Sequence, residues 1–293
     1  MLQNSILDFF ASHPYLEQGI TPHMFDMEKD SEGALRRLRL DIVDMAEHSS
    51  HVAAAFSCVE ILAALYFGVL RVSPDDAGAD DRDRFILSKG HGCMALYAVL
   101  ARRGFLPLSA LETYAHDHST LAEHPLAGKV PGIEFAAGSL GHGLAVAAGM
   151  AKALSLQGNG ARVFVLLGDG ECDEGTVWEA AAFAATQGLG NLTAIVDANG
   201  MQACGRCSEV SQNVSLTDAW AAFGWQVEEV DGHNVGALRE VLDRKAAQAT
   251  PRVVIAHTKK GKGIPYMEDN LEYHYRPLRG EEREKARRSL SDA

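Results

Sequence analysis

Two short polar turns follow apolar segments in the middle of the chain and could hold an anion together with a metal. Gly168-Asp169-Gly170 ends an apolar run at 162–168, and Asn199 follows a second apolar run, thirty residues after Asp169. In open α/β sheets, ligands bind beyond the carboxyl ends of the strands. Glycines there let backbone N–H groups approach a diphosphate, and a following helix N-terminus favours anions. The carboxylate and amide oxygens, completed by a backbone carbonyl and phosphate oxygens, predict an octahedral Mg²⁺ site.

A regular alternation of apolar runs and helix-like stretches surrounds these turns. The run at 162–168, the helical stretch at 176–188 and the run at 191–198 predict one βαβ unit. Strands that are apolar on both sides are typical of a parallel sheet covered by helices on both faces. The pattern recurs as a strand at 224–230, a helix near 235–247 and a strand at 252–258.

The first half of the chain is mostly helical in pattern. Apolar residues recur with helical spacing in ALRRLRLDIVDMAEH, and CVEILAALYFGVL predicts a second, more buried helix. RFILS predicts a short strand, and GHGCMALYAVLARRG predicts a helix that ends at Gly104. A helix rich in Gly and Ala is predicted at 138–154, and its small side chains suit close packing on another helix or subunit.

Length and charge limit the classes of function. The 293 residues are interpreted as one α/β domain at 33–293 behind an N-terminal arm at 1–32, with a polar surface helix at the C-terminus. Lysine and arginine number 27 against 39 aspartate and glutamate, a formal net charge of −12. Such an acidic chain is a poor general binder of nucleic acid or anionic membranes. An anionic ligand must therefore be held locally, by a metal, helix N-termini or a few His and Lys side chains.

Five scattered cysteines, no signal-like N-terminus and apolar runs of only about ten residues predict a cytoplasmic protein without a membrane span. Cys204-Gly-Arg-Cys207 has the spacing of a redox pair or of half a zinc site. Because no second such motif and no thioredoxin-like context accompany it, we expect neither function. Lys259, Lys260 and Lys262 form a basic run that is expected to be solvated, although one of them could help to hold a phosphate.

Several motifs together resemble the transketolase family. GDG-x₃-EG-x₂-WEA followed by LGNLTAIVDAN is similar to the family's motif for binding thiamine diphosphate (ThDP). Further segments resemble the family in the same order, namely DRFILSKGHGCMALYAVLARRGF, AEHPLAGKVPGIEFAAGSLGHGLAVAAGMA, DGHN, HTKKGKGIPYME and YHYRPL. The resemblance extends from about residue 34 to about residue 280.

The resemblance implies the ThDP-binding α/β fold, with a parallel sheet sandwiched by helices. Full-length family members also carry a pyrimidine-binding domain, with the Glu that activates the aminopyrimidine ring, and a C-terminal domain. The resemblance thus implies a subunit of a split transketolase, inactive alone and completed by a C-terminal partner subunit in an α2β2 heterotetramer. With ThDP and Mg²⁺, the complex would transfer a two-carbon ketol unit from a ketose or ketose phosphate donor to an aldose acceptor.

The resemblance also implies roles for residues around the two polar turns. Asp169, Asn199 and the backbone carbonyl of Met201 would bind Mg²⁺, with an Asx turn or a cap as the alternative for the two side chains. Gly168 and Gly170 would admit the diphosphate, with a tight turn as the alternative.

Other matched residues are implied to surround the cofactor. Glu174 matches a family Glu at the contact between paired active sites, with a helix N-terminal carboxylate as the alternative. Glu171 and His142 are expected as neighbours of the cofactor. Gly138 and Leu140 match the segment near the aminopyrimidine, with plain core as the alternative for Leu140.

Four of the twelve histidines fall at family positions, His51, His91, His124 and His274. Imidazoles can donate hydrogen bonds to sugar hydroxyls and move protons near neutral pH. The resemblance implies that His51 and His124 contact the donor ketose, and that His91 and His274 lie near the diphosphate and thiazolium. The sequence departs from the family where SSHVA replaces SGHPG and where YHY replaces HG.

Two other functions remain open at the level of sequence. One is another ThDP-dependent enzyme subunit, similar to deoxyxylulose-phosphate synthase or to a decarboxylating 2-oxoacid component. Such enzymes usually lack the combination of EG-x₂-WEA and LSKGH, and a donor assay with a ketose against pyruvate discriminates them. The other is a non-catalytic ThDP-domain binding protein, which need not retain Asp169, Asn199 and several family histidines.

Overall fold

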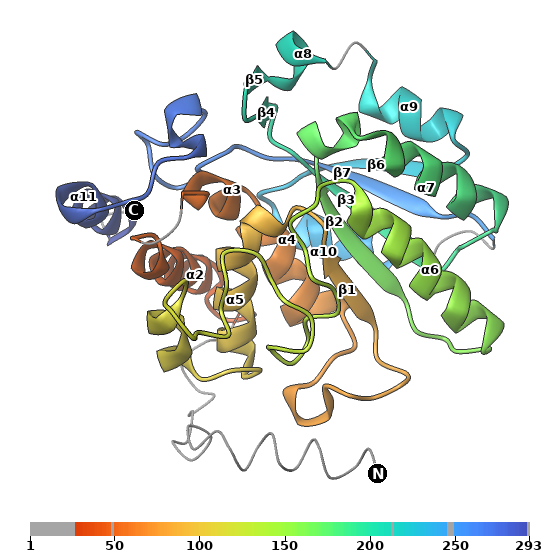
Figure 1. The fold of residues 1–293 in the computed structure, drawn as a ribbon, viewed down its shortest axis with the longest axis horizontal. Coiled ribbons are helices and arrows are strands. Elements are labelled where there is room, and N and C mark those ends of the chain that lie inside the picture. The colour runs from red at the N-terminus through yellow and green to blue at the C-terminus, as the bar shows by residue number, and fades with distance from the viewer. Residues whose placement is uncertain (1–26, 48–49, 212–213, 245–248, 292–293) are drawn as a thin grey trace.

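Five parallel strands form a single sheet in the order β1-β2-β3-β7-β6 (Figure 1). The structure, a computed structural model, describes residues 27–47, 50–211, 214–244 and 249–291. The strands are β1 (Arg84–Leu87), β2 (Val163–Gly168), β3 (Leu192–Ala198), β6 (Gln226–Asp231) and β7 (Arg252–His257). This arrangement confirms the predicted parallel sheet, although β6 begins two residues later than the pattern suggested.

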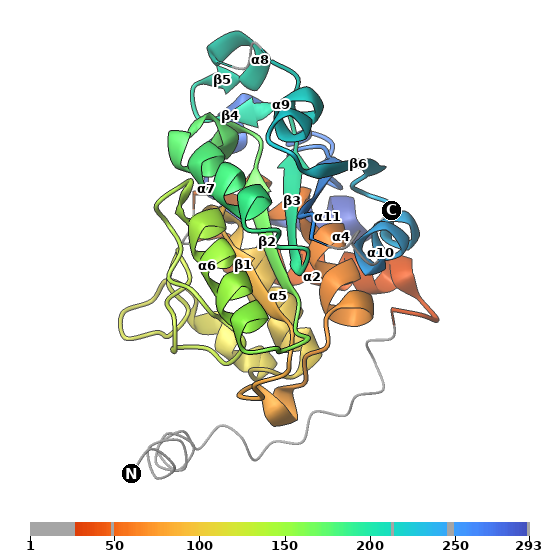
Figure 2. The same cartoon turned by 90° about the vertical axis from the view of Figure 1, so that its right-hand side faces the viewer.

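Helices cover both faces of the sheet, which confirms the predicted sandwich (Figures 1 and 2). One face packs against α6 (His142–Leu156), α7 (Gly175–Thr186) and α9 (Leu216–Ala222). The other packs against α2 (Ser31–Met45), α3 (Val52–Ser57), α4 (Val59–Ala64) with a π-helical turn at Leu65–Val69, α5 (Cys93–Arg103), α10 (Val235–Asp243) and α11 (Gly280–Ser291). Alternate residues of each strand serve the two cores, so the central strands are buried throughout their length.

Short elements occupy the connections. Single 3₁₀ turns occur at Pro74–Asp76, Gly90–Gly92, Leu108–Thr113, Gly170–Asp173 and Leu271–His274. The chain after β3 forms a small hairpin of β4 (Met201–Gln202) and β5 (Gly205–Arg206), followed by α8 (Cys207–Val210). In Figure 1 this hairpin stands above the ends of the central strands. No helix in the described part of the chain is long and apolar enough to cross a membrane.

The helix predicted at 138–154 begins at His142, four residues later than expected. Gly138 and Gly141 have φ values of 139° and 80°, which exclude the right-handed helix. A Cβ at Gly141 would lie 2.4 Å from the Thr176 Oγ1, so this turn packs directly against the start of α7. The Gly-rich segment therefore forms a turn before the helix, because close packing decides its conformation rather than helix propensity.

Both ends of the predicted domain show small differences. The first helix begins at Ser31, inside the predicted arm, because the Asp30 carboxylate caps it by accepting the Gly33 N–H at 2.9 Å. Residues 1–26, most of that arm, lie outside the described residues, as do 245–248 at the end of the helix predicted near 235–247. The C-terminal surface helix is confirmed as α11, which buries Ala286 and Leu290.

Candidate cofactor site

The two predicted metal ligands lie side by side at the carboxyl edge of the sheet. Gly168 pairs with Asp197 in the register of β2 and β3, so Asp169 and Asn199 follow aligned strand ends. Both side chains are buried. The Asp169 carboxylate accepts N–H bonds from Gly170 at 2.9 Å and from Gly200 at 2.5 Å.

Local hydrogen bonds hold both predicted ligands in turns. The Asn199 Oδ1 accepts the N–H of Met201 at 3.1 Å, which is the Asx turn that the sequence left as an alternative. Burial, and then the charge of nearby Asp197, raise the pKa of Asp169 to about 6. A buried carboxylate that faces a second carboxylate favours a bound cation, so the chemistry of this position fits a metal.

Within the described residues, no group of three or more His, Cys, Asp or Glu side chains could hold a metal ion. The predicted donor set consists of one carboxylate, one amide and one backbone carbonyl, from Asp169, Asn199 and Met201. Such a set fits an ion whose remaining ligands are oxygens of a diphosphate and water, as Mg²⁺ prefers.

A buried ion pair beneath these residues was not expected from the sequence. The Lys89 ammonium pairs with the Asp197 carboxylate and also donates to the Ala54 carbonyl at 3.2 Å. Asp197 accepts further bonds from the hydroxyls of Ser57, at 2.5 Å, and Thr258. Burial alone would lower the pKa of Lys89 and raise that of Asp197, but their mutual attraction outweighs it and both remain charged. An Asp inside the apolar run of β3 was the available sequence signal.

Lys260 corrects the expectation that the basic run is solvated. This residue is only 2% exposed, whereas Lys259 is exposed and Lys262 is half-buried. Its Nζ lies 2.7 Å from the His274 Nδ1. Burial, and then the charge of Lys89, lower the pKa of Lys260 to about 8, so it is protonated at pH 7 and donates to His274. The ring proton of His274 is therefore on Nε2.

The other three predicted histidines surround His51. Its ring centroid lies 5.4 Å from that of His91, 6.2 Å from that of His124 and 5.9 Å from that of His274. Tyr275, for which the sequence suggested no role, lies 5.1 Å from His51. The four histidines come from the start of α3, two 3₁₀ turns and the loop before α6.

The protein environment keeps three of these rings neutral, those of His51, His91 and His274. Burial, followed by the charges of neighbouring His and Lys side chains, lowers the pKa of His51 to about 4 and that of His274 to about 3. The same causes lower the pKa of His91 well below its ordinary value. At neutral pH these imidazoles therefore act as neutral donors and acceptors.

Glu171 ties three segments together beside the site. Its Oε1 accepts the N–H of Gly141 at 2.8 Å and the hydroxyl of Ser88, and its Oε2 accepts the N–H of Gly168 at 3.1 Å. The carboxylate thus holds the ends of β1 and β2 against the turn before α6. These bonds give Glu171 a structural task next to its predicted place near the cofactor.

The remaining predicted residues lie on the more open side. Gly138 is exposed, and a Cβ there would come within 3.5 Å of the His124 ring, so this segment borders the histidines. Leu140 is half-buried rather than core, and the exposed His142 contacts its carbonyl oxygen at 3.0 Å through Nδ1. Glu174 is exposed at the start of α7.

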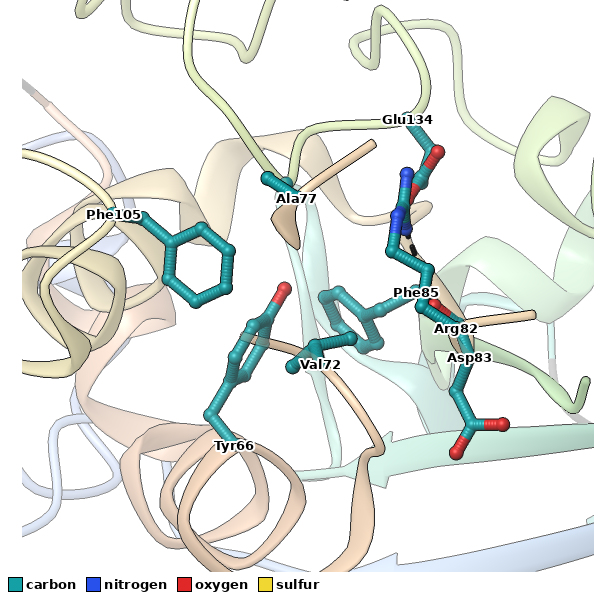
Figure 3. Close-up of a pocket in the computed structure, with 9 residues that line it drawn as sticks. Tyr66, Val72, Ala77, Arg82, Asp83, Phe85, Phe105 and Glu134 are labelled. Atoms are coloured by element: carbon teal, nitrogen blue, oxygen red, sulfur yellow. Dashed lines mark hydrogen bonds and ion pairs between the residues drawn. The ribbon is translucent and has the colours of Figure 1, made fainter. Parts of the chain in front are cut away.

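Two other features lie outside the site's chemistry. Cys204 is exposed and Cys207 is buried, and both are free thiols. The hollow in Figure 3 borders the amino end of β1, where Tyr66 packs against Phe85 with ring centroids 5.6 Å apart. None of the predicted site residues lines that hollow.

Comparison with known proteins decides the family. Residues 27–291 match the family model described as Transketolase, thiamine diphosphate binding domain. The chain belongs to the transketolase family. The resemblance and the ThDP-binding fold are thereby confirmed, and the matched region covers all of the described elements.

Relatives of similar length match this transketolase-family chain. An apulose-4-phosphate transketolase subunit of Actinobacillus succinogenes is 40% identical over 267 residues, which cover 91% of this chain and 96% of that protein. A 6-deoxy-6-sulfo-D-fructose transketolase subunit of Clostridium sp. is 40% identical over 225 residues, 76% of this chain and 82% of that protein. The chain is thus a subunit of the transketolase type.

Solved transketolases share the fold. A Pichia stipitis transketolase variant in complex with fructose 6-phosphate aligns with a TM-score of 0.82 and 28% identity. The alignment covers 89% of this chain and 40% of that chain. The protein therefore corresponds to less than half the length of the solved transketolases that it matches.

Proposed function

We propose that this subunit joins a partner subunit to transfer a two-carbon ketol unit from a ketose to an aldose, using ThDP and Mg²⁺. The partner would carry the pyrimidine-binding domain and its activating Glu, in an α2β2 heterotetramer. The observation that carries the proposal is the convergence of four histidines, one of which, His274, contacts Lys260, whose charge in turn acts on Asp169. The near full-length match to a protein that is itself named as a transketolase subunit supports the two-chain organisation.

The residues of this edge would hold the cofactor. Asp169, Asn199 and the Met201 carbonyl would bind Mg²⁺, and Gly168 and Gly170 would leave room for the diphosphate. When bound, ThDP would supply the carbon nucleophile that attacks the ketose carbonyl and carries the two-carbon unit.

The balance of buried charge favours an anionic ligand at this place. Asp197 neutralises Lys89, whereas the ammonium of Lys260 contacts a neutral imidazole, that of His274. Lys260 would therefore offer its positive charge to the diphosphate. His91 and His274 would lie nearest the diphosphate and thiazolium, with the Nε2–H of His274 as a fixed donor.

The other histidines would handle the sugar. His51 and His124 would bind the carbonyl and first hydroxyls of the donor ketose. Because the pKa of His51 is lowered to about 4, its ring is neutral at pH 7 and would accept a hydrogen bond from a hydroxyl of the donor ketose. Glu174, exposed at the start of α7, would contact the paired active site in the assembly.

Co-purification of the chain with its partner tests this function. We expect the complex to transfer a two-carbon unit only with both ThDP and Mg²⁺ present. Because two relatives are named for a ketose phosphate and a sulfonated ketose, donors of both kinds should be screened beside pyruvate. Activity with pyruvate alone would favour a decarboxylating enzyme, and transfer by the isolated chain would disprove the need for a partner.

A further inference from the structure

The loop that carries Lys260 is held on both sides by side chains from distant helices and loops. We define residues 258–263, which follow β7, as the lysine loop; Figure 1 shows the chain beyond β7 running beside α3. The N–H of Lys259 donates to the His233 Nε2 at 2.8 Å. The Arg39 Nε donates to the carbonyl of Lys262 at 3.0 Å. The backbone is therefore fixed immediately before and shortly after Lys260.

Both holding side chains meet at one buried carboxylate, Glu60 of α4. Its Oε1 accepts the Arg39 guanidinium at 2.5 Å, and its Oε2 lies 3.1 Å from the His233 Nδ1. Because the His233 Nε2 accepts the Lys259 N–H, the ring proton must be on Nδ1, where it donates to Glu60. The carboxylate thus sets the tautomer that the Lys259 bond requires.

Both carboxylate oxygens of Glu60 take part in these contacts. It is 3% exposed, and each of its oxygens contacts one of the two holding side chains. Burial would raise the pKa of Glu60, but the His233 hydrogen bond and the Arg39 charge outweigh burial and hold it below its usual range. Glu60 is therefore ionised. Because it lies far from the lysine loop in the sequence, it reaches the side chains that hold this loop only in the folded protein.

The held loop carries Lys260 into the site. Lys260 reaches the Nδ1 of His274 at 2.7 Å, and this bond fixes the orientation and tautomer of that ring. A small displacement of the loop backbone would move the ammonium away from the ring and weaken its charge interaction with Asp169. Arg39, Glu60 and His233 thus act on Lys260 through two hydrogen bonds to the backbone of the lysine loop.

We propose that Arg39, Glu60 and His233 are positioning residues that place Lys260, and through it His274, for the diphosphate of the cofactor. The inference rests on the proposed function for its cofactor, but the placement of the loop can be tested without it. None of the three residues contacts the reacting atoms in this scheme. Their effect is on cofactor affinity rather than on the chemical step.

A pair of His233 variants separates the two nitrogens of the ring. In His233→Gln, the amide oxygen can replace Nε2 as acceptor of the Lys259 N–H, whereas the shorter His233→Asn can replace only Nδ1. We expect the complex with its partner to bind ThDP, at fixed Mg²⁺, about tenfold more weakly in His233→Asn. His233→Gln should stay within about threefold of the parent complex, and kcat at saturating ThDP should change little in either variant.

A second pair of variants compares Arg39→Lys with the same substitution at a control residue, Arg102. Arg39→Lys keeps a charge for Glu60 but loses the Nε bond to the Lys262 carbonyl. Arg102 forms a comparable two-bond contact with Asp41 between α5 and α2, away from the lysine loop. Arg102→Lys should lower the unfolding midpoint to a similar extent and leave the ThDP dissociation constant unchanged.

Hydrogen exchange of the lysine loop gives a readout that does not need the cofactor. In the full chain, exchange across 258–263 should speed up in His233→Asn and Arg39→Lys, and not in His233→Gln or Arg102→Lys. Equal exchange in all four variants, or equal loss of ThDP affinity in the two His233 variants, would overturn the positioning role. If the parent complex bound no ThDP, the proposed function would fail, while the exchange pattern would still decide whether the triad places the loop.

Discussion

The two edges of the parallel sheet use the same charged residue types in opposite ways. At the amino edge, the buried carboxylate of Asp83 lies between Arg71 and Arg162, each at 2.8 Å. Arg244 pairs with Glu228 at 2.7 Å. These guanidinium groups remain partly in contact with solvent, at 56%, 28% and 53% side-chain exposure respectively. The charges there are satisfied by one another and by water.

The carboxyl edge contains both an ion pair and contacts between like charges. Lys89 and Asp197 form a fully buried pair. Beside them, however, Asp169 faces Asp197, a like charge, and Lys260 faces both Lys89 and a neutral ring. Burial and these like charges raise the pKa of Asp169 and lower that of Lys260. Perturbed titratable groups in such a position are typical of functional sites.

Unmatched charges therefore mark the candidate site better than ion pairs do. At the amino edge, the Asp83 carboxylate has both of its cations within the chain, Arg71 and Arg162. The carboxyl edge holds a carboxylate and an ammonium that a metal and a diphosphate would each stabilise. Substitutions at one edge at a time should therefore differ in their effects on stability and on cofactor binding.

The largest effect is expected for Lys89→Met. It leaves the Asp197 carboxylate buried without its cation, which typically costs about 3–5 kcal/mol of the free energy of unfolding. Urea unfolding at pH 7 measures this cost. The amino-edge counterpart, Asp83→Asn, should cost about half as much, because its two arginines can turn to solvent. Equal costs at both edges would show that burial of the pair does not matter.

Asp169→Asn should separate binding from stability. We expect the affinity of the complex for Mg²⁺ and ThDP to fall by about 100-fold, a loss seen when a metal site is disturbed. The unfolding free energy of the cofactor-free chain should stay level or rise by about 1 kcal/mol, because a buried like-charge contact with Asp197 is removed. Isothermal titration and urea unfolding check the two parts, and a destabilised variant with normal affinity would contradict both.

Acidification should weaken the carboxyl edge next. Burial and then nearby charge lower the pKa of His51 to about 4 and of His274 to about 3, so the unfolded chain binds protons that the folded chain refuses. Above about pH 6.5 the two rings are neutral in both the folded and the unfolded chain, and the free energy of unfolding is not reduced. As the pH falls toward 4, this free energy decreases by about 1 kcal/mol for each ring after solvent screening. Unfolding measured across this pH range should show a flatter slope in the variant His51→Asn/His274→Asn.

The smallest effect is expected for Arg244→Ala at the amino edge. Both of its ion pairs, with Glu228 and Glu240, involve a largely exposed guanidinium. The variant should leave the midpoint of urea unfolding almost unchanged, at low salt and in 1 M salt alike. A larger loss that persists in salt would mean that the amino edge is held as tightly as the carboxyl edge.

The sequence predicted the sheet and the Asp169 and Asn199 edge because these features follow from local patterns. Apolar runs of strand length define β2, β3 and β7, and the polar turns come directly after them. Parallel strands then bring the turns to one edge without further information. The convergence of the four histidines came from the family resemblance, since no spacing rule relates positions so far apart.

The sequence did not predict the buried cations or the start of α6. Burial of Lys89 requires Asp197, 108 residues away, and a run of three lysines gives no sign that only Lys260 turns inward. Likewise Gly141 adopts a positive φ because α7 packs against it, which helix propensity cannot register. In each case the deciding partner comes from another part of the chain.

The bond pattern around Asp197 also bears on how the chain reaches its native state. Its carboxylate joins Ser57 and Lys89, which precede it by 140 and 108 residues, and Thr258, which follows by 61. Contacts of such high sequence separation form slowly, because the chain loses conformational entropy before the contacts contribute favourable energy. The cofactor edge should therefore be the last part to assemble, and a nascent chain that ends before β7 would contain most of the core but would lack Thr258, Lys260 and His274.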